Sequence, residues 1–244
     1  MRRSPGNVGD AFGRFLRDRV DGQAGYEIVE RDDGLLMITT GQMYFDPFSR
    51  WASVERRALR LMRGRVLDVG CGAGRLTLEL QRRGLEAVGF DSSPLAVEVA
   101  LQRGVEEAHV LPLEQLDGRF GVFDTVAMYG NNFGLLGNPV RSRRLLRRLL
   151  RLTTSRARIV ASSLDPYQTD DPVHLAYQAR NRSRQRMSGQ LRIRVRYRET
   201  ASSWFDYLLV SREEMAALAD QGGWRLVRTI DGEGPLYVGV LEPR

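Results

Sequence analysis

The segment Val66–Gly74, which reads Val-Leu-Asp-Val-Gly-Cys-Gly-Ala-Gly, constrains the fold of this chain more than any other. Its first four residues form a short apolar run interrupted by Asp68, which is typical of a strand buried in a parallel sheet. Gly70, Gly72 and Gly74 come next, and the leucine-rich segment that follows them has the apolar spacing of a helix. A strand that turns through glycines into a helix lets a ligand approach the backbone closely, because no Cβ blocks it.

The spacing of these glycines distinguishes between classes of ligand. A dinucleotide fingerprint reads Gly-x-Gly-x-x-Gly and places a pyrophosphate at the helix N-terminus. Here the third glycine comes one residue early, and Asp68 stands on the strand just before the loop. A carboxylate would repel a pyrophosphate but attract an amino group. The loop therefore predicts a zwitterionic or cationic ligand.

A second acidic residue follows about twenty residues later. The segment Glu86–Asp91 predicts a strand that ends in a carboxylate. At that place in a doubly wound sheet an acid accepts hydrogen bonds from both ribose hydroxyls, and its charge disfavours a 2′-phosphate. Ser93 and Pro94 then suit the cap and first residue of a helix, so a purely helix-capping role for Asp91 is the alternative.

Residues 65–163 resemble the class I S-adenosylmethionine-dependent methyltransferases, with Val66–Gly74 as their first motif and Asp91 as their ribose-binding acid. Glu107–Leu113 is similar to their third-strand motif, which reads Asp-Ala-x-x-Leu-Pro-Phe. The resemblance implies that Glu107 lies near the adenine amino group and that the Ala108 N–H faces the ring. Glu106 is the alternative acid, and a solvated strand end is the alternative role for both glutamates. The resemblance implies S-adenosylmethionine as the cofactor, held by Asp68, Gly70, Cys71, Gly72, Gly74, Asp91, Ser92, Glu107, Ala108 and Tyr129.

The loop after the next predicted strand, Phe123–Met128, carries polar side chains where ligands bind in open parallel sheets. Tyr129, Asn131 and Asn132 can orient a substrate there, although Gly and Asn are also ordinary turn residues. His174 is the other candidate catalytic residue, with Asp165 and Tyr167 as competitors. None of them has a defensible assignment as a general base, so the catalytic group stays unknown. Tyr44, Phe45 and Trp51 are aromatic candidates to cover the cofactor, with packing of the N-terminal region as the alternative for Trp51.

Charge and cysteine content limit the remaining function classes. The formal net charge is +7, which favours nucleic acid as a partner, but all the basic residues are Arg and they are dispersed. In Val140–Leu152 the arginines cover the polar side of a predicted helix. The single cysteine, Cys71, excludes an internal disulfide, fits a reducing compartment and leaves no soft metal site. No long apolar run or secretory signal is present, so we expect a cytoplasmic protein without a membrane segment and without a bound metal.

The expected architecture is α/β: a doubly wound, seven-stranded, mostly parallel (Rossmann-like) sheet with an N-terminal cap and an inserted β-hairpin lid. The expected regions are a cap at 1–62, a cofactor-binding core at 63–163, a lid at 164–211 and a C-terminal completion of the sheet at 212–244. In the lid, apolar residues alternate with arginines from Leu191 to Arg198, and Trp204–Val210 can pair back as a second strand. Asp206 or a partner surface is expected to offset part of the arginine charge.

The remaining elements follow from shorter patterns. Strands are predicted at Tyr26–Val29 and Leu35–Thr39, around the turn at Asp32–Gly34. Helices are predicted at Ser53–Met62, His174–Arg186 and Arg212–Gln221. Further strands are expected at Arg158–Ser162, Arg225–Ile230 and Tyr237–Leu241.

Together these features predict an enzyme that methylates oxygen, nitrogen or carbon of a small molecule by in-line transfer. Two alternatives remain. A nucleic-acid methyltransferase is favoured by the basic charge, although no Asn-Pro-Pro-Tyr-like tetrapeptide follows Met128. A non-catalytic S-adenosylmethionine-binding regulator is consistent with the missing base. The lid hairpin also makes a homodimer plausible.

Overall fold

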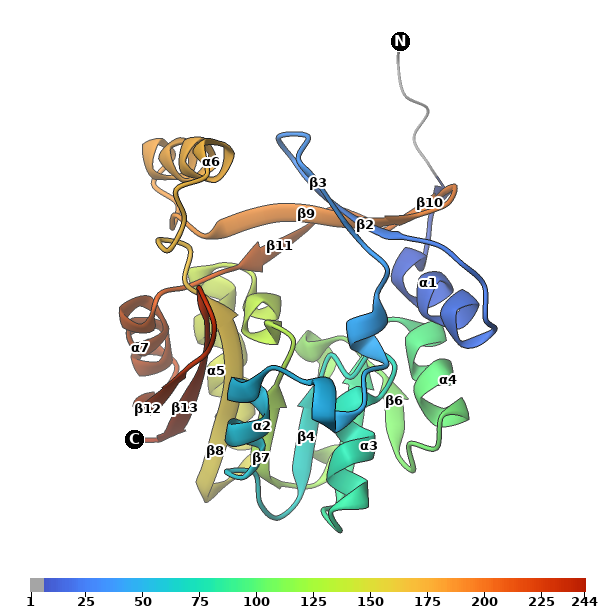
Figure 1. Cartoon of the computed structure of the whole chain (residues 1–244). Helices are drawn as coiled ribbons and strands as arrows, with labels where there is room; N and C mark the ends of the chain where they lie inside the picture. Colours follow the sequence, from blue (N-terminus) through green and yellow to red (C-terminus); the bar gives the residue numbers. More distant parts are fainter. Residues whose placement is uncertain (1–6) are drawn as a thin grey trace.

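The protein contains two β-sheets and the helices that pack against them, as Figure 1 shows for the computed structural model. The structure describes residues 7–244, so the first six residues of the expected cap region lie outside the described part. We call the larger sheet the core sheet and the smaller one the lid sheet.

The core sheet has seven strands. In order across it they are β12 (Trp224–Asp231), β13 (Leu236–Pro243), β8 (Thr153–Leu164), β7 (Phe123–Met128), β4 (Val66–Val69), β5 (Ala87–Asp91) and β6 (Ala108–Val110). Strand β13 runs antiparallel to both β8 and β12, and the other pairs are parallel. The predicted doubly wound, mostly parallel sheet with an antiparallel final strand is confirmed.

Helices cover both faces of the core sheet. The α-helices of the described part of the chain, of which α6 contacts the lid sheet instead, are α1 (Ala11–Val20), α2 (Ser53–Leu59), α3 (Arg75–Arg82), α4 (Pro94–Gln102), α5 (Pro139–Arg151), α6 (Pro172–Ser183) and α7 (Arg212–Gln221). One apolar cluster joins the sheet to α5 and α7, and a second joins the opposite face to α2 and α3. Within α5, Leu145, Leu146 and Leu149 are buried and the arginine-rich side faces outward, as the pattern predicted.

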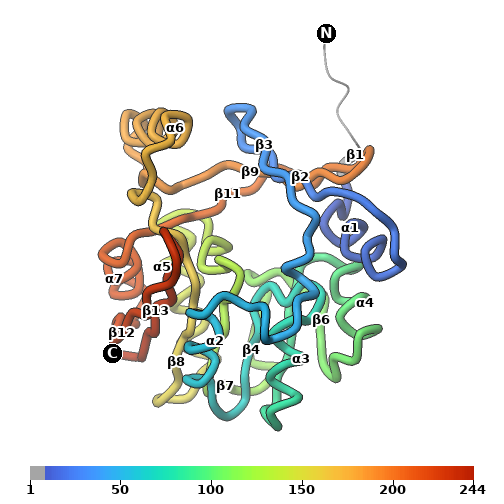
Figure 2. The backbone as a smooth tube through the Cα atoms, viewed as in Figure 1, coloured from blue at the N-terminus to red at the C-terminus, as the bar shows by residue number. Residues whose placement is uncertain are grey.

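The lid sheet combines strands from both ends of the chain. Its strands are β1 (Asn7–Val8), β10 (Thr200–Ala201), β9 (Gln190–Tyr197), β2 (Glu27–Arg31) and β3 (Leu36–Thr39), in this order, with β11 (Phe205–Leu208) also paired to β9. The predicted hairpins β2–β3 and β9–β11 both form. In addition, β2 pairs with β9, so the cap and the inserted segment, which the sequence separates, share one sheet. Figure 2 shows β9 and β11 crossing above the ends of the core strands.

The boundaries of several elements differ from the sequence expectation. Helix α2 ends at Leu59, because the N–H groups of Leu61 and Met62 bond to carbonyls three residues back and tighten the chain into a turn before Gly64. Strand β8 extends on both sides of the predicted Arg158–Ser162, because its last residues pair with β13 and Thr153 at its start pairs with Phe123 of β7. No helix of residues 7–244 is long and apolar enough to cross a membrane.

Candidate functional site

The glycine loop connects β4 to α3 and has a left-handed backbone at alternate residues. The φ angles of Gly70, Gly72 and Gly74 are 71°, 53° and 77°, which L-residues with a side chain rarely adopt. A Cβ on Gly70 would collide with the Asn132 side chain, whereas a Cβ on Gly72 would face only the ring of Phe12. Gly72 therefore leaves its backbone open toward the cavity described below. Cys71 is buried beside it, and burial raises the pKa of its thiol well above the usual value. Both observations fit a residue that packs the loop and does not act as a nucleophile.

Asp91 lies at the end of β5, where the sequence places the ribose-binding acid. Its Oδ2 accepts a hydrogen bond from Gly72 N (2.9 Å) and its Oδ1 accepts one from Ser93 N (2.9 Å). Desolvation raises the pKa of this carboxyl, and those two backbone donors lower it in part. Asp91 and Ser92 both line the cavity, so Asp91 both holds the glycine loop and faces the space beyond it.

Asp68 is the buried acid in front of the glycine loop, with a relative exposure of 2%. Its Oδ2 accepts a hydrogen bond from the Thr77 hydroxyl at 2.7 Å. Burial raises the pKa of Asp68 to about 6, and the Thr77 hydrogen bond and the charge of Arg75 oppose that rise. Asp68 is thus a carboxyl on the cavity wall without a bonded cationic side chain among the described residues, which suits a ligand ammonium group.

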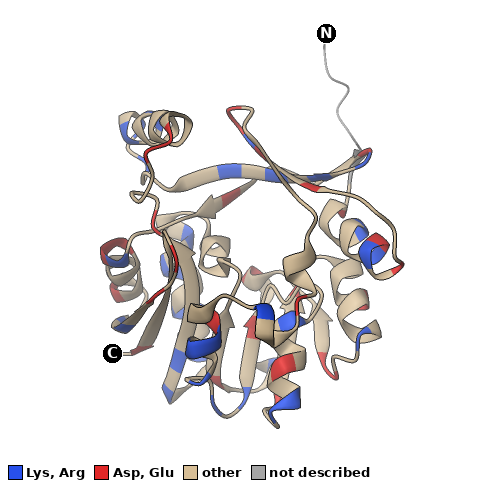
Figure 3. Cartoon of the chain, in the orientation of Figure 1, with Lys and Arg blue, Asp and Glu red and all other residues tan. Residues whose placement is uncertain are grey.

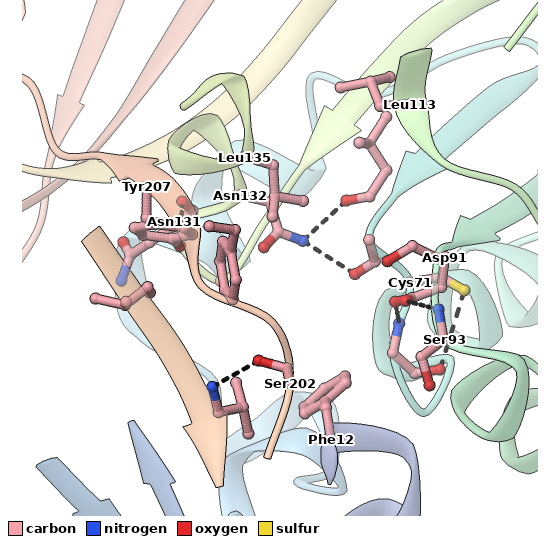
Figure 4. Close-up of a pocket in the computed structure, with 18 of the residues that line it drawn as sticks. Phe12, Cys71, Asp91, Ser93, Leu113, Asn131, Asn132, Leu135, Ser202 and Tyr207 are labelled. Atoms are coloured by element: carbon pink, nitrogen blue, oxygen red, sulfur yellow. Dashed lines mark hydrogen bonds between the residues drawn. The ribbon is translucent and has the colours of Figure 1, made fainter. Parts of the chain in front are cut away.

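The loop after β7 contacts the glycine loop directly. The Asn132 side chain donates hydrogen bonds to the carbonyls of Val69 (2.8 Å) and Gly70 (2.9 Å). Figure 4 shows this amide between the two loops. Asn132 therefore holds the glycine loop in place, a role that turn chemistry alone does not indicate.

Two other predicted residues of this loop are committed to internal contacts. Tyr129 is buried on the cavity wall, and its hydroxyl donates to the backbone carbonyl of Glu55 at 2.9 Å. Asn131 adopts a left-handed conformation (φ 64°), and its carbonyl accepts a hydrogen bond from the Tyr207 hydroxyl at 2.6 Å. Its side-chain Oδ1 is a buried atom without a partner among the described residues, and the residue lines the cavity. Of these two, Asn131 alone keeps a free polar atom.

The adenine assignment to Glu107 and Ala108 disagrees with the position of these residues. Ala108 pairs with Gly89, two residues before Asp91, and neither Glu107 nor Ala108 lines the cavity. The Glu107 carboxylate instead contacts His109 (2.9 Å) and Arg65 (3.8 Å). Strand β6 runs parallel to β5, and Val110 is level with Asp91 at the end of β5. The residues that follow Val110 all line the cavity: Leu111, Pro112, Leu113 and Glu114.

The proposed catalytic histidine and its competitors also lie elsewhere. His174 is on α6, its Nδ1 lies 3.0 Å from Arg31 Nη1, and it is absent from the cavity wall. Asp165 forms an ion pair with Arg212 (3.3 Å), and the Tyr167 hydroxyl donates to Glu214 (2.7 Å). None of the three lines the cavity.

A cavity of about 1160 Å³ lies between the core sheet and the lid sheet. Its floor contains the glycine loop, Asp68 and Asp91, and its roof contains the inward row Leu191, Ile193 and Val195 of β9. Trp204, Phe205 and Tyr207 add aromatic rings from the segment that includes β11. Figure 4 shows Phe12 and Ser202 on one side of this space and Leu113 and Leu135 on another. A cavity above the usual range of roughly 300–1,000 Å³ has room for a cofactor and a second small molecule.

Asp10, which the sequence analysis did not single out, connects helix α1, just after the first strand of the lid sheet, to helix α4 of the core. The Asp10 carboxylate caps α1 by accepting from Gly13 N (2.8 Å), and it also accepts from Ser93 Oγ (2.7 Å) and Leu95 N (3.1 Å) at the start of α4. One carboxylate thus joins the first turns of two helices. This contact places Phe12 over the glycine loop.

The buried carboxyl of Glu27 was also missed by the sequence analysis. Glu27 lines the cavity, is 2% exposed, and its Oε2 accepts a hydrogen bond from the Tyr44 hydroxyl at 2.7 Å. Tyr44 lines the cavity and packs edge-on against Phe12, whereas Phe45 is absent from the cavity wall and lies against Arg103. Trp51 instead packs in the core cluster below α2, as the alternative interpretation held. Within residues 7–244, no three His, Cys, Asp or Glu side chains come together as a metal site.

Comparison with known proteins identifies relatives of this fold. A family profile described as a methyltransferase domain matches residues 66–155. The ubiquinone biosynthesis O-methyltransferase of Azorhizobium caulinodans is 37% identical over 83 residues, which is 34% of this chain and 31% of that protein. Trans-aconitate 2-methyltransferase of Mycobacterium ulcerans is 40% identical over 68 residues, 27% of this chain and 23% of that protein. The chain therefore spans a third or less of the length of these curated relatives.

Similarity to a solved structure extends over nearly the whole chain. A SAM-dependent methyltransferase from Bacteroides fragilis, in complex with S-adenosyl-L-homocysteine, superposes with a TM-score of 0.82 and 26% identity, covering 96% of this chain and 94% of that one. The order and direction of the core strands and the glycine loop at the end of β4 agree with this similarity. Residues 66–155 therefore match a methyltransferase domain, and nearly the whole chain shares its fold with a SAM-dependent methyltransferase.

Proposed function

We propose that this protein transfers the methyl group of S-adenosylmethionine to a small, largely apolar molecule held under the lid sheet. The observation that carries the proposal is the cavity itself, which joins an acid-flanked glycine loop to an apolar roof. When bound, the cofactor supplies an electrophilic methyl group on a positively charged sulfur. The chain then has to hold donor and acceptor in line and exclude water, and such positioning alone supplies several kcal/mol.

The residues present fit this cofactor on three points. Asp68 offers a buried carboxyl to an ammonium group, and the open backbone of Gly72 permits close approach. Asp91 stands at the strand end where ribose hydroxyls are bound in doubly wound sheets. We further propose that Leu111–Glu114, in place of Glu107 and Ala108, border the adenine ring.

Titration calorimetry with S-adenosylhomocysteine tests the cofactor assignment. Wild-type protein is expected to bind in the micromolar range, and Asp91→Ala is expected to weaken binding about tenfold or more through loss of charge-assisted hydrogen bonds. Glu106→Ala is a control on an exposed acid off the cavity wall. Failure of the wild-type protein to bind at high micromolar ligand, or equal affinities of Asp91→Ala and wild type, contradicts the assignment.

The two alternative functions predict different measurements. A nucleic-acid enzyme would bind RNA or DNA with an affinity that falls steeply with salt. The charges argue against it, because acidic and basic positions are interspersed along the elements coloured in Figure 3 and several arginines are paired with acids. A non-catalytic regulator would bind the cofactor but release no S-adenosylhomocysteine with any acceptor. The apolar roof and the size of the cavity favour a small-molecule enzyme over both.

Two further features of the proposal concern the protein's surroundings. A cytoplasmic location is supported by the one, buried, free cysteine. A homodimer is supported by the outer strand β3, where Leu36, Met37 and Ile38 are 42%, 41% and 62% exposed on an unpaired sheet edge. Light scattering after size-exclusion chromatography tests it: Ile38→Lys is expected to convert a dimer to a monomer, and a monomeric wild-type protein contradicts it.

A further inference from the structure

Most of the residues that β2, β3 and β9 contribute to the cavity wall are apolar, and Glu27 is an exception. On β2, alternate residues point the same way, and Glu27 and Val29 both line the cavity. Val29 pairs with Val195 of β9 and with Met37 of β3, which also line it. Glu27 therefore places a carboxyl group next to the apolar cavity-lining side chains of Val29 and its strand partners.

Glu30 occupies the opposite face of the same strand and behaves differently. It accepts from Arg194 (2.9 Å) and Arg196 (3.2 Å) on the outer face of β9. Figure 3 shows basic residues along that strand. The ion pairs with Arg194 and Arg196 compensate the charge of Glu30 on the outer face of the lid sheet. No described cationic side chain forms an ion pair with Glu27, whose one hydrogen-bond donor is the neutral hydroxyl of Tyr44.

The other acids of the cavity wall are held by neighbouring groups. They are Asp10, held by Ser93; Asp68, held by Thr77; Asp91, held by two backbone N–H groups; Glu114, held by Arg141; and Asp206, held by Arg192. Asp10, Asp68 and Asp91 belong to the glycine-loop side, and Asp206 is paired with a cation. Glu27 is thus the acid of the apolar lid wall that retains an oxygen, Oε1, without a hydrogen-bond donor from residues 7–244.

Tyr44 fixes where this carboxyl lies. Its hydroxyl holds Oε2 at 2.7 Å, and its ring packs edge-on against Phe12 with centroids 5.3 Å apart. Phe12 in turn lies against Gly72 of the glycine loop. The carboxyl is therefore placed on the side of the cavity next to the loop that we propose holds the cofactor's amino-acid portion.

Burying a carboxyl in an apolar wall is unfavourable unless a hydrogen-bond donor compensates it. Burial raises the pKa of Glu27, and the Tyr44 hydrogen bond offsets only part of that effect. A ligand that brings an O–H or N–H to Oε1 recovers the lost interaction, whereas a ligand carboxylate meets like charge.

We propose that Glu27 is the acceptor-recognising residue, and that the acceptor is an apolar molecule that presents a hydroxyl or amine hydrogen to its carboxylate. This inference rests on the proposed function and specifies its substrate class. The apolar body of the acceptor contacts the valine, isoleucine and aromatic side chains of the lid, and its polar group lies against Glu27, on the side of the glycine loop.

Three probes with the same ring test the proposal: 2-naphthol, 2-naphthylmethylammonium and 2-naphthoate. Each is titrated into S-adenosylhomocysteine-saturated wild-type protein, Glu27→Gln and Glu30→Gln. Wild type and Glu30→Gln are expected to bind the two donor probes at least about tenfold more tightly than naphthoate, because the donor probes hydrogen-bond to the charged carboxylate and naphthoate is repelled by it. In Glu27→Gln the preference is expected to fall below about threefold. Tyr44→Phe, which keeps the carboxylate, is expected to retain the preference.

The outcomes separate the inference from the proposed function. Absence of S-adenosylhomocysteine binding in wild type overturns the proposed function. Normal cofactor binding without any binding of the probes at millimolar concentration overturns the inference alone. It is also overturned if Glu27→Gln keeps the preference, or if that variant loses cofactor affinity while Glu30→Gln does not, since Glu27 would then belong to the cofactor site. Thermal unfolding of all variants verifies that each is folded at the assay temperature.

Discussion

Asp68 makes the affinity for the cofactor depend on pH in a direction that the structure fixes. Burial raises its pKa to about 6 from 3.8, so in the ligand-free protein the carboxyl is about one-tenth ionised at pH 5 and about nine-tenths ionised at pH 7. An ammonium group beside Asp68 favours the ionised form. Binding therefore releases a proton below pH 6, and the affinity for S-adenosylhomocysteine is expected to rise about tenfold from pH 5 to pH 7.

The same shift determines the stability of the ligand-free protein. The pKa of this acid is higher in the folded than in the unfolded chain, so the folded protein binds the extra proton between pH 3.8 and about 6. Stability from this group is greatest below pH 3.8 and falls as the pH rises to about 6, by about 3 kcal/mol in all. Asp68→Asn is therefore expected to raise the Tm at pH 7 relative to wild type, with a smaller difference at pH 4.

Calorimetry in buffers of different ionisation enthalpy measures both the affinity and the released proton. Asp68→Asn is expected to lose the tenfold rise and the proton release, leaving only the contribution of other acids such as Asp91. Thr77→Val is the matched variant, because it keeps the carboxyl and removes its 2.7 Å hydrogen bond, which moves the transition to higher pH. Equal pH profiles for wild type and Asp68→Asn would refute the reasoning.

Three other variants test separate parts of the site. Gly13→Ala is expected to destabilise the protein by about 1–3 kcal/mol in thermal unfolding, because the added Cβ collides with Ser93 Oγ and the Asp10 carboxylate; an unchanged Tm contradicts the close packing of α1 on α4. Asn132→Ala removes two hydrogen bonds to the glycine loop and is expected to weaken S-adenosylhomocysteine binding about tenfold, measured by calorimetry. Glu107→Gln is expected to change that affinity less than about twofold, and a large loss would restore the adenine role that its position argues against.

Short sequence patterns were sufficient to predict the core sheet and the position of the glycine loop. The apolar run before Gly70, the glycines themselves and the acid at the end of the next strand all act over a few residues, so sequence position determines where they lie. Asp68 and Asp91 accordingly occupy the cavity wall as predicted. The same holds for the β2–β3 hairpin, whose turn at Asp32–Gly34 sets its register.

The third strand shows where a motif match fails. Glu107–Leu113 resembles the family pattern in composition, but the pattern does not specify how far the strand extends before its loop. Strand β6 is short and level with the end of β5, so the residues at the cavity are Leu111–Glu114. The motif and the position of these residues differ in register along the sheet, which depends on pairing with β5 and which a single strand cannot reveal.

The pairing of β2 with β9 gives Glu27 its place in the cavity, and this pairing joins residues more than 160 positions apart. In the sequence, Glu27 lies in the predicted strand Tyr26–Val29 and Glu30 directly follows that strand. Since side chains alternate across a strand, an odd spacing sends them to opposite faces, and the arginines on the outer face of β9 decide which acid is paired there. Glu30 takes both ion pairs, so Glu27 is left among apolar side chains facing the core. The arginine alternation that suggested a basic surface in the sequence therefore has a second consequence: it fixes the orientation of β2 and places an acid without a cationic partner inside the cavity.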